Sequence, residues 1–345
     1  IDTQTNSLSS YFYQVIAHPS GNEACAAAPT TCTAATVLGN ADLWSKDKPW
    51  DTGGEPDPLT AADNMWESED IWIRRNQTAG PHQDPLLGSI NYVHVLWKNE
   101  GPATAVNAVV EVYISPASTG LSWPSDWTKI GSGVITSLAS GASTEVVIPW
   151  IPDVTGHVCM IARLVTPQDP MAYTETADVN YNTRQNNNIV WRNLNVVLMF
   201  GNPGGGNVQV HNVLHEMRMT RIKVRDRLDR GVRTNFLKRG RVLLTIGAPM
   251  MQRWIQGGRL GQGYKVIDDQ TIEFTALGGK LGDPYIDVKL MADEKIPMKI
   301  QFLDTARATD PRTIDQHVIE LRQEDVEKKQ VVGGVTYQIQ AYKAL

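Results

Sequence analysis

The stretch INYVHVLWKNEGPATAVNAVVEVYIS, residues 90–115, decides the fold of this chain of 345 residues. Within it the period of two places Val93, Val95 and Trp97 on one face of a strand and Tyr92, His94 and Leu96 on the other. The same kind of pattern recurs in MWESEDIWIRRN (65–76), GLSWPSDWTKIG (120–131), PWIPDVTGHVCMIARL (149–164) and RQNNNIVWRNLNVV (184–197). Short alternating strands separated by Gly, Pro and Asn turns predict an immunoglobulin-like β-sandwich. The expected strands are 70–74, 91–98, 106–115, 133–138, 145–150, 157–165 and 189–197.

The length of the chain favours two domains. We predict an N-terminal extension over residues 1–64, a first sandwich over 65–200, a Gly-rich linker over 201–207 and a second β-sandwich over 208–345. The second sandwich is expected to use strands near 208–213, 242–246, 271–275, 286–291, 298–302, 318–322 and 335–341. The predicted fold class is therefore all-β, with two tandem immunoglobulin-like antiparallel sandwiches and an N-terminal extension.

Charge is distributed unevenly along the chain, although the net charge is only −5. Residues 1–200 contain 9 Lys and Arg against 20 Asp and Glu, whereas residues 201–345 contain 23 against 17. The basic residues gather in RMTRIKVRDRLDRGVRTNFLKRGR, residues 218–241. Complementary halves favour head-to-tail contacts between copies. The alternative is that two unrelated domains have different isoelectric points.

The extension contains one strand candidate, residues 10–16, with the alternating sequence SYFYQVI. A single strand is not stable alone, so it must pair with a domain of its own chain or with a neighbouring molecule. In the second case copies of the chain would form a homo-oligomer or a filament. The residues predicted to mediate this self-assembly are Tyr11, Tyr13, Val15, Arg218, Arg221, Arg225 and Arg227.

Cys25 and Cys32 flank the short loop CAAAPTTC, a spacing that suits a local disulfide in an oxidising compartment. Two reduced surface thiols are the alternative. The chain starts at Ile1, as a mature exported protein does after its signal peptide is removed, and a trimmed sequence would look the same. We therefore expect an extracellular or cell-surface location, and no apolar run is long enough to predict a membrane span.

Four carboxylates and two glycines fall within DKPWDTGGEPD, residues 47–57. Asp47, Asp51, Glu55 and Asp57 could supply the oxygen ligands that calcium requires. Calcium is the one cofactor that the sequence suggests. The alternative is a solvated acidic loop in which Asp and Gly favour turns.

No catalytic motif is apparent, and we expect the protein not to be an enzyme. The segment HNVLHE, residues 211–216, differs from the zinc motif HExxH because its glutamate lies outside the histidine pair. The basic segment could meet an anionic polysaccharide or the acidic half of a neighbouring copy. Nucleic acid is not expected, since aromatic residues are nearly absent from it.

The segments quoted above, together with DLWSKDKPWDTGGEPDP at residues 42–58, resemble a family of secreted bacterial proteins that carry a cell-adhesion-related (CARDB-like) immunoglobulin-like domain. The resemblance covers nearly half the chain. It implies a sandwich fold and an exported protein, and it implies no activity for the domain itself.

These observations predict a non-enzymatic bacterial surface protein with a structural or adhesive role, which could assemble head to tail into a filament. The alternative is an accessory module of a secreted hydrolase that binds carbohydrate or protein. In that case Trp123 and Trp127 would have to be exposed as a binding platform.

Overall fold

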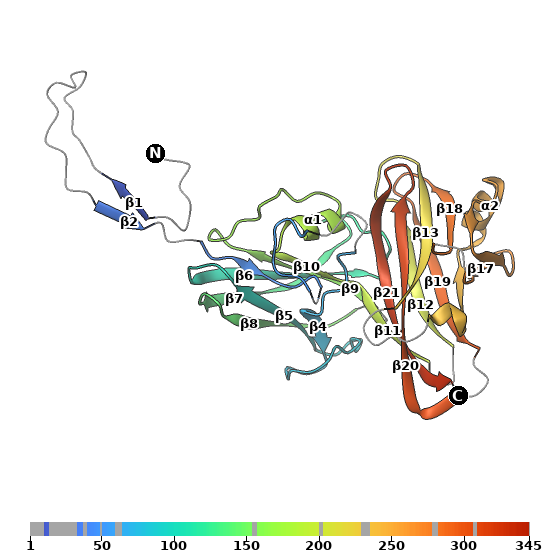
Figure 1. Cartoon of the computed structure of the whole chain (residues 1–345), viewed down its shortest axis with the longest axis horizontal. Helices are drawn as coiled ribbons and strands as arrows, with labels where there is room; N and C mark the ends of the chain where they lie inside the picture. Colours follow the sequence, from blue (N-terminus) through green and yellow to red (C-terminus); the bar gives the residue numbers. More distant parts are fainter. Residues whose placement is uncertain are drawn as a thin grey trace, which may run out of the picture.

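The structure, a computed structural model, describes residues 10–13, 33–36, 40–48, 50–58, 64–153, 157–199, 203–228, 235–277, 282–305 and 309–344. Four sheets form two tandem β-sandwiches that lie side by side along the long axis of the molecule (Figure 1). Among the described strands the pairing is antiparallel except for β11 and β21, which pair in parallel at the edge of the largest sheet. The predicted all-β fold class is confirmed.

The first sandwich packs two four-stranded sheets against each other. One contains β3 (Leu43–Trp44), β4 (Ile71–Arg74) and β8 (Ser143–Trp150), all paired with β5 (Asn91–Asn99). The other has the order β10 (Ile189–Arg192), β9 (Val158–Val165), β6 (Ala105–Pro116) and β7 (Thr128–Leu138). One short helix, α1 (Val179–Gln185), lies between β9 and β10 in the sequence and begins at Asp178, whose side chain accepts the Tyr181 N–H.

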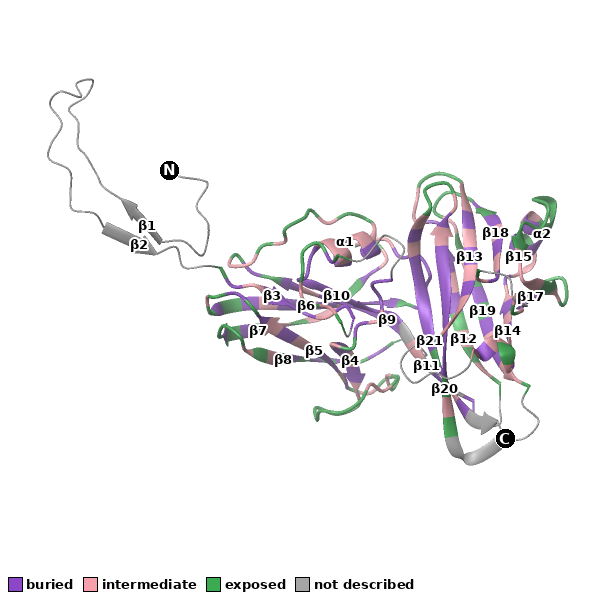
Figure 2. Cartoon of the chain, viewed as in Figure 1, coloured by how far each residue is buried: buried purple, intermediate pink, exposed green. Residues whose placement is uncertain are grey.

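The alternation in residues 91–99 decides which side of β5 is buried, as expected. Val93, Val95 and Trp97 are fully buried in the core between the two sheets. Burial of such apolar surface is the main favourable contribution to folding. Figure 2 shows this core as a purple layer through the first sandwich.

The second sandwich contains a six-stranded and a five-stranded sheet. The six-stranded sheet has the order β11 (Leu194–Met199), β21 (Gln330–Ala344), β20 (Thr309–Asp325), β13 (Arg218–Arg227), β18 (Tyr285–Leu290) and β15 (Gly261–Gln262). The five-stranded sheet has the order β12 (Gly204–His211), β19 (Lys295–Asp304), β14 (Gly240–Thr245), β17 (Thr271–Phe274) and β16 (Tyr264–Val266). The turn η2 (Phe236–Lys238) precedes β14, and the helix α2 (Ala248–Gln256) packs on β18.

Strand β13 lies in the middle of the six-stranded sheet, although the sequence analysis did not predict it. Thr220, Ile222 and Val224 are buried, and the basic side chains alternate with them on the other face. The many arginines of this segment obscured the alternation of buried and partly exposed residues along the strand. Helix α2 was missed as well, and it buries Met250, Met251 and Trp254 against the second core.

The predicted strand 189–197 is divided between the two sandwiches. Residues 189–192 form β10 of the first sandwich, and residues 194–199 form β11, which pairs in parallel with β21 of the second. Asn193 separates the two strands and is fully buried. The chain thus passes from one sandwich to the other over a single residue.

The glycines that were expected in a linker, Gly204 to Gly206, lie in strand β12. Gly205 has φ +149°, and a Cβ there would come within 2.2 Å of the Ile300 carbonyl oxygen on β19. A Cβ on Gly204 would come within 2.3 Å of the Val197 side chain. Glycine is required here because two strands approach closely.

The N-terminal strand candidate forms β1 (Ser10–Tyr13), which pairs antiparallel with β2 (Thr33–Thr36) of the same extension. Tyr11 and Tyr13 lie in β1, whereas Val15, Cys25 and Cys32 lie outside the described residues. Within the described part of the chain, no helix has the length and apolarity needed to cross a membrane.

Candidate functional site

The two sandwiches are connected by an extensive set of contacts, which we call the joint. It comprises the contacts of residues 64–68, 117–126 and 193 with strands β12, β13, β19, β20 and β21. Its backbone hydrogen bonds continue sheet-like pairing across the boundary: the Thr119 N–H donates to the Gln209 carbonyl at 2.7 Å, and the Gln209 N–H donates to the Ala117 carbonyl at 3.0 Å. Buried backbone groups are therefore satisfied by the other sandwich.

Asn193 ties three segments together at the crossing point. Its side-chain amide donates to the Ser118 carbonyl at 3.0 Å and to the Gly334 carbonyl at 2.6 Å, while its Oδ1 lies 2.6 Å from Nε2 of His157. Its own carbonyl accepts the Thr336 N–H at 3.0 Å. Burial of the His157 ring lowers its pKa to about 4, and the hydrogen bond with Asn193 offsets only part of this shift.

Three glycines allow the close approach of the two sandwiches. A Cβ on Gly334 would lie 2.5 Å from the Trp66 ring, and a Cβ on Gly333 would lie 2.4 Å from the Thr119 carbonyl oxygen. A Cβ on Gly120 would lie 2.4 Å from the carbonyl oxygen of His211. The joint therefore has no room for side chains at these positions.

A buried ionic network occupies the centre of the joint. Glu320 is fully buried, and Arg227 pairs both with it, at 3.2 Å, and with Glu67 of the first sandwich, at 3.0 Å. Arg322, only 3% exposed, donates to the other oxygen of Glu320. Thr336 donates to Glu67 and accepts the Trp66 indole N–H at 3.2 Å. The carboxylates and guanidinium groups thus pair with one another across the boundary.

A second ionic contact lies at the other end of the joint. Asp126 of the first sandwich accepts a hydrogen bond from Lys295 of β19 at 2.6 Å, and its other oxygen lies 3.0 Å from Nδ1 of His211. Burial alone would raise the pKa of Asp126, but His211 and Lys295 hold it well below the usual range. The carboxylate is therefore ionised at neutral pH.

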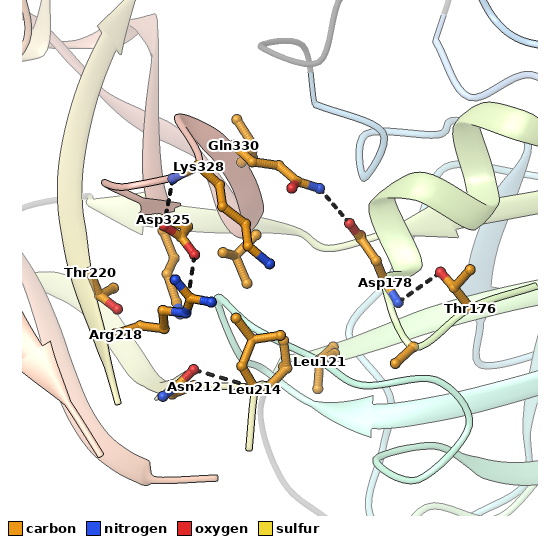
Figure 3. Close-up of a pocket in the computed structure, with 15 residues that line it drawn as sticks. Leu121, Thr176, Asp178, Asn212, Leu214, Arg218, Thr220, Asp325, Lys328 and Gln330 are labelled. Carbon is orange, nitrogen blue, oxygen red and sulfur yellow. Dashed lines mark hydrogen bonds and ion pairs between the residues drawn. The ribbon is translucent and has the colours of Figure 1, made fainter. Parts of the chain in front are cut away.

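A cavity of about 270 Å³ opens beside the joint (Figure 3). Leu121 and residues 176–178 line it from the first sandwich, and the second sandwich contributes Asn212, Val213, Leu214, Arg218, Thr220, Gln323, Asp325, Lys328, Gln330, Val331 and Val332. Gln330 donates to Asp178 across the boundary at 2.8 Å. The wall of the cavity is largely apolar, which is typical of sites for small ligands.

Arg218 and Asp325 form an ion pair at the wall of this cavity (Figure 3). Nε of Arg218 lies 3.9 Å from Oδ2 of Asp325, and both atoms are buried and unsatisfied among the described residues. This pair adds charged side chains to the largely apolar wall of the cavity.

The acidic segment of the extension folds over α1 and the start of β10. The side chain of Asn187 donates to the Gly53 carbonyl at 2.9 Å and to Asp42 at 3.1 Å, and the Asp57 N–H donates to the Arg184 carbonyl at 2.8 Å. Gly53, at φ +79°, makes the turn that packs this segment against Trp44.

Three of the four predicted metal ligands come together there. One carboxylate oxygen from each of Asp47, Asp51 and Asp57 lies within 4.8 Å of the others, and we call this group the acidic cluster. Glu55 is not part of it, because its Oε1 accepts the Asn187 N–H at 2.8 Å. Burial raises the pKa of Asp47 well above its usual value, and the charges of Asp51 and Asp57 raise it further.

The arginines predicted to meet a neighbouring molecule form ion pairs within their own chain. Arg218 pairs with Glu216 and Glu327, and Arg221 binds Asp287 through two hydrogen bonds of 2.8 and 2.9 Å. Strands β18 and β20, on either side of β13, supply most of the acidic partners of this stripe. Much of the positive charge that the sequence displays is thus neutralised locally.

Arg225 and Arg227 are engaged in the same way. Arg225 lies 3.4 Å from Asp283 and 3.5 Å from Glu320, and Arg227 belongs to the ionic network of the joint. The sequence could not show these pairs, since each joins residues that are far apart along the chain.

Trp123 and Trp127 do not form an exposed platform. Trp127 is only 8% exposed, and the ring of Trp123 packs edge-on against Tyr113 at a centroid distance of 4.9 Å. Both belong to the small core next to the joint, which also contains Trp66 and Trp191. The accessory-module hypothesis therefore loses the residues on which it was based.

No protein-family model and no curated protein matches this chain. Among solved structures, it is similar to the CARDB domain of a Pyrococcus furiosus protein, solved in complex with di-metal ions, with 17% identity over 40% of this chain and 96% of that one and a TM-score of 0.22. It is also similar to the CupB6 tip adhesin of Pseudomonas aeruginosa, with 10% identity over 88% and 98% of the two chains and a TM-score of 0.24. The adhesive subunit CfaE of the CFA/I fimbria of enterotoxigenic Escherichia coli gives 8% identity over 89% and 94% and a TM-score of 0.19. At these scores the similarities carry no argument about function.

Proposed function

We propose that this chain is a non-enzymatic structural or adhesive component of a bacterial surface, in which the two sandwiches act as one stiff unit. The observation that carries the proposal is the joint. Domains that move freely relative to each other are connected by a flexible linker and share a polar interface. Here the crossing takes one residue, backbone hydrogen bonds pass between the sandwiches, and the ionic network at its centre is buried.

The environments of the potential catalytic groups support a non-enzymatic role. Burial raises the pKa of Cys159 to about 12, which disfavours the nucleophilic thiolate at neutral pH. His157 holds Asn193 in the joint, and His94 is fully buried beside Glu145. Cys159 and His94 line neither the cavity of Figure 3 nor a second cavity of about 650 Å³. His157 lines the second one together with Ala117 and Gln209, and its Nε2 is held there by Asn193.

Distance measurements between the sandwiches test the stiffness. Spin labels on two exposed sites, Ser137 of β7 and Lys265 of β16, should give one narrow distance distribution in pulsed electron resonance. The variant Arg227→Ala, which opens the ionic network, should broaden it, whereas Lys129→Ala on the exposed strand β7 should not. A broad distribution in the unmodified protein would contradict the proposal.

The adhesive part requires a surface assay. Beads coated with the protein should bind bacterial or host surfaces, or an anionic polysaccharide, more strongly than beads coated with a single isolated β-sandwich protein of similar charge. Binding that persists when the cavity is narrowed by Leu214→Trp would place the contact elsewhere on the molecule. No binding to any of these surfaces would leave the structural role alone.

Head-to-tail filament formation remains a prediction. Its ionic component is weakened, since the basic residues of β13 have partners in their own chain. Negative-stain electron microscopy at low and high salt tests it. Filaments that persist in high salt would favour strand addition, because exposed ion pairs are screened. A monomer under every condition would overturn self-assembly and leave the stiff-unit proposal intact.

A further inference from the structure

We propose that Asp47, Asp51 and Asp57 bind a divalent cation, for which calcium is the best match, and that the ion fastens the acidic segment to the first sandwich. The proposal concerns a site outside the joint and does not depend on the function proposed above.

The geometry of the acidic cluster suits the ion. Calcium binds oxygen at about 2.3–2.6 Å, so two oxygens on opposite sides of it are about 4.8 Å apart and adjacent ones are closer. The three carboxylate oxygens lie within that distance of one another. Asp51 is only partly buried, which leaves access for the ion and for the water molecules that complete its coordination.

A second observation shows that the cluster lacks a ligand. Asp47 is 3% exposed, and its Oδ1 is buried without a hydrogen-bond partner among the described residues. A buried carboxylate oxygen without a hydrogen-bond partner is destabilising. A cation at the cluster would remove this penalty.

The charges near Asp47 do not by themselves offset the cost of burying its carboxylate. The carboxylates of Asp51, Asp57 and Asp70 all act on Asp47 unfavourably, and Lys48 is the only cation that acts in the opposite direction. One ammonium group against four carboxylates leaves an excess of negative charge, which a divalent ion would largely neutralise.

The position of the cluster indicates what binding would do. The same segment contacts α1 and β10 through the Asn187 amide and the Arg184 carbonyl. An ion held by residues on both sides of the Gly53 turn would close this loop and fix it on the sandwich. Binding should therefore stabilise the first sandwich in particular.

Calcium titration of the chelator-treated full chain tests the proposal. Nine of the ten tryptophans precede residue 200, so tryptophan fluorescence reports mainly on the first sandwich. We expect calorimetric binding with a stoichiometry of one, and a rise of about 3–8 °C in the unfolding midpoint at saturating calcium. Magnesium should bind more weakly, because it requires a smaller octahedral site.

Two variants and a control separate a metal site from a general salt effect. Asp51→Asn should weaken calcium binding at least about tenfold, in the range seen when a ligand shell is disturbed. Asp47→Asn should abolish the calcium response, yet leave the metal-free protein as stable as before or more stable, since it removes a buried charge. Asp153→Asn, an exposed aspartate of the same sandwich, should change nothing.

Several outcomes would overturn the site. These are the absence of heat and of a midpoint shift with calcium, magnesium and manganese, or a full calcium response in Asp47→Asn. Equal loss of response in Asp153→Asn would likewise assign the effect to ionic strength. If Asp47→Asn does not fold, Asp51→Asn decides alone, because that residue is only partly buried.

Discussion

The joint and the acidic cluster both contain buried carboxylates, and they differ in how the charge is balanced. At the joint, Glu320 is fully buried and is matched by Arg227 and Arg322. At the acidic cluster, Asp47 is equally inaccessible, and the nearby charges are mostly of its own sign. The chain thus supplies its own cations where two sandwiches must be held together. Where it does not, we propose that a bound cation balances the charge.

Removal of one partner from the joint gives the largest expected effect. Glu320→Ala leaves the buried guanidinium of Arg322 without this carboxylate and leaves Arg227 with Glu67. Breaking a buried pair in this way costs about 3–5 kcal/mol. Urea unfolding followed by circular dichroism measures the loss, with Lys129→Ala on the exposed face of β7 as control. A loss below about 1 kcal/mol would mean that solvent reaches the network.

Acid should weaken the joint through His157. Its folded pKa of about 4 lies below the unfolded value of about 6.5, so the unfolded state binds the proton more readily. The stabilising contribution is complete above pH 6.5 and is lost progressively as the pH falls toward 4, by up to about 3 kcal/mol.

Stability measured between pH 7 and 4.5 in the wild type and in His157→Gln isolates this effect. The variant should lose stability less steeply with acid, whereas His215→Gln, at an exposed histidine, should follow the wild type. Parallel curves for wild type and His157→Gln would show that His157 does not control the acid response.

The close approach of the sandwiches predicts the next effect. In Gly334→Ala the new methyl group would lie 2.5 Å from the Trp66 ring and 2.8 Å from the Leu321 carbonyl oxygen. Overpacking of this kind costs about 1–3 kcal/mol. Gly206→Ala is a suitable control, since its Cβ would meet only the Asn195 amide, at 3.8 Å. Equal unfolding free energies for the two variants would argue against a tightly packed joint.

Local sequence pattern predicted most of the long strands of the two sandwiches, but not β13, helix α2 or the contacts between the sandwiches. The alternation of Val93, Val95 and Trp97 predicted the core face of β5, because a strand with one buried face repeats every two residues. Asn193 gave no comparable signal. Its importance comes from Ser118, His157 and Gly334, which are remote along the chain.

The acidic cluster was largely predictable, whereas the fate of the arginines was not. Asp47, Asp51 and Asp57 lie close in sequence, so a tight turn suffices to bring them together. Glu55 was misplaced by the same reasoning, since its partner Asn187 is 132 residues away. Arg227 likewise pairs with Glu67 across the joint, and only the folded arrangement of both sandwiches reveals that contact.

The smallest expected effect comes from an ion pair that is partly exposed to solvent. Arg221 and Asp287 face each other across β13 and β18, with side chains 27% and 11% exposed, and the guanidinium also stacks on Tyr285 at 3.8 Å. A partly solvated pair of this kind contributes about 0.2–1 kcal/mol, because water already stabilises the separated charges. A double-mutant cycle with Arg221→Ala and Asp287→Ala, measured by urea unfolding at low and high salt, should give a coupling energy in this range that decreases with salt. A coupling as large as that of the Glu320 network would remove the distinction between buried and exposed pairs.

If Arg221→Ala instead left stability unchanged but altered the oligomeric state in light scattering, the basic residues of β13 would regain their predicted role in self-assembly.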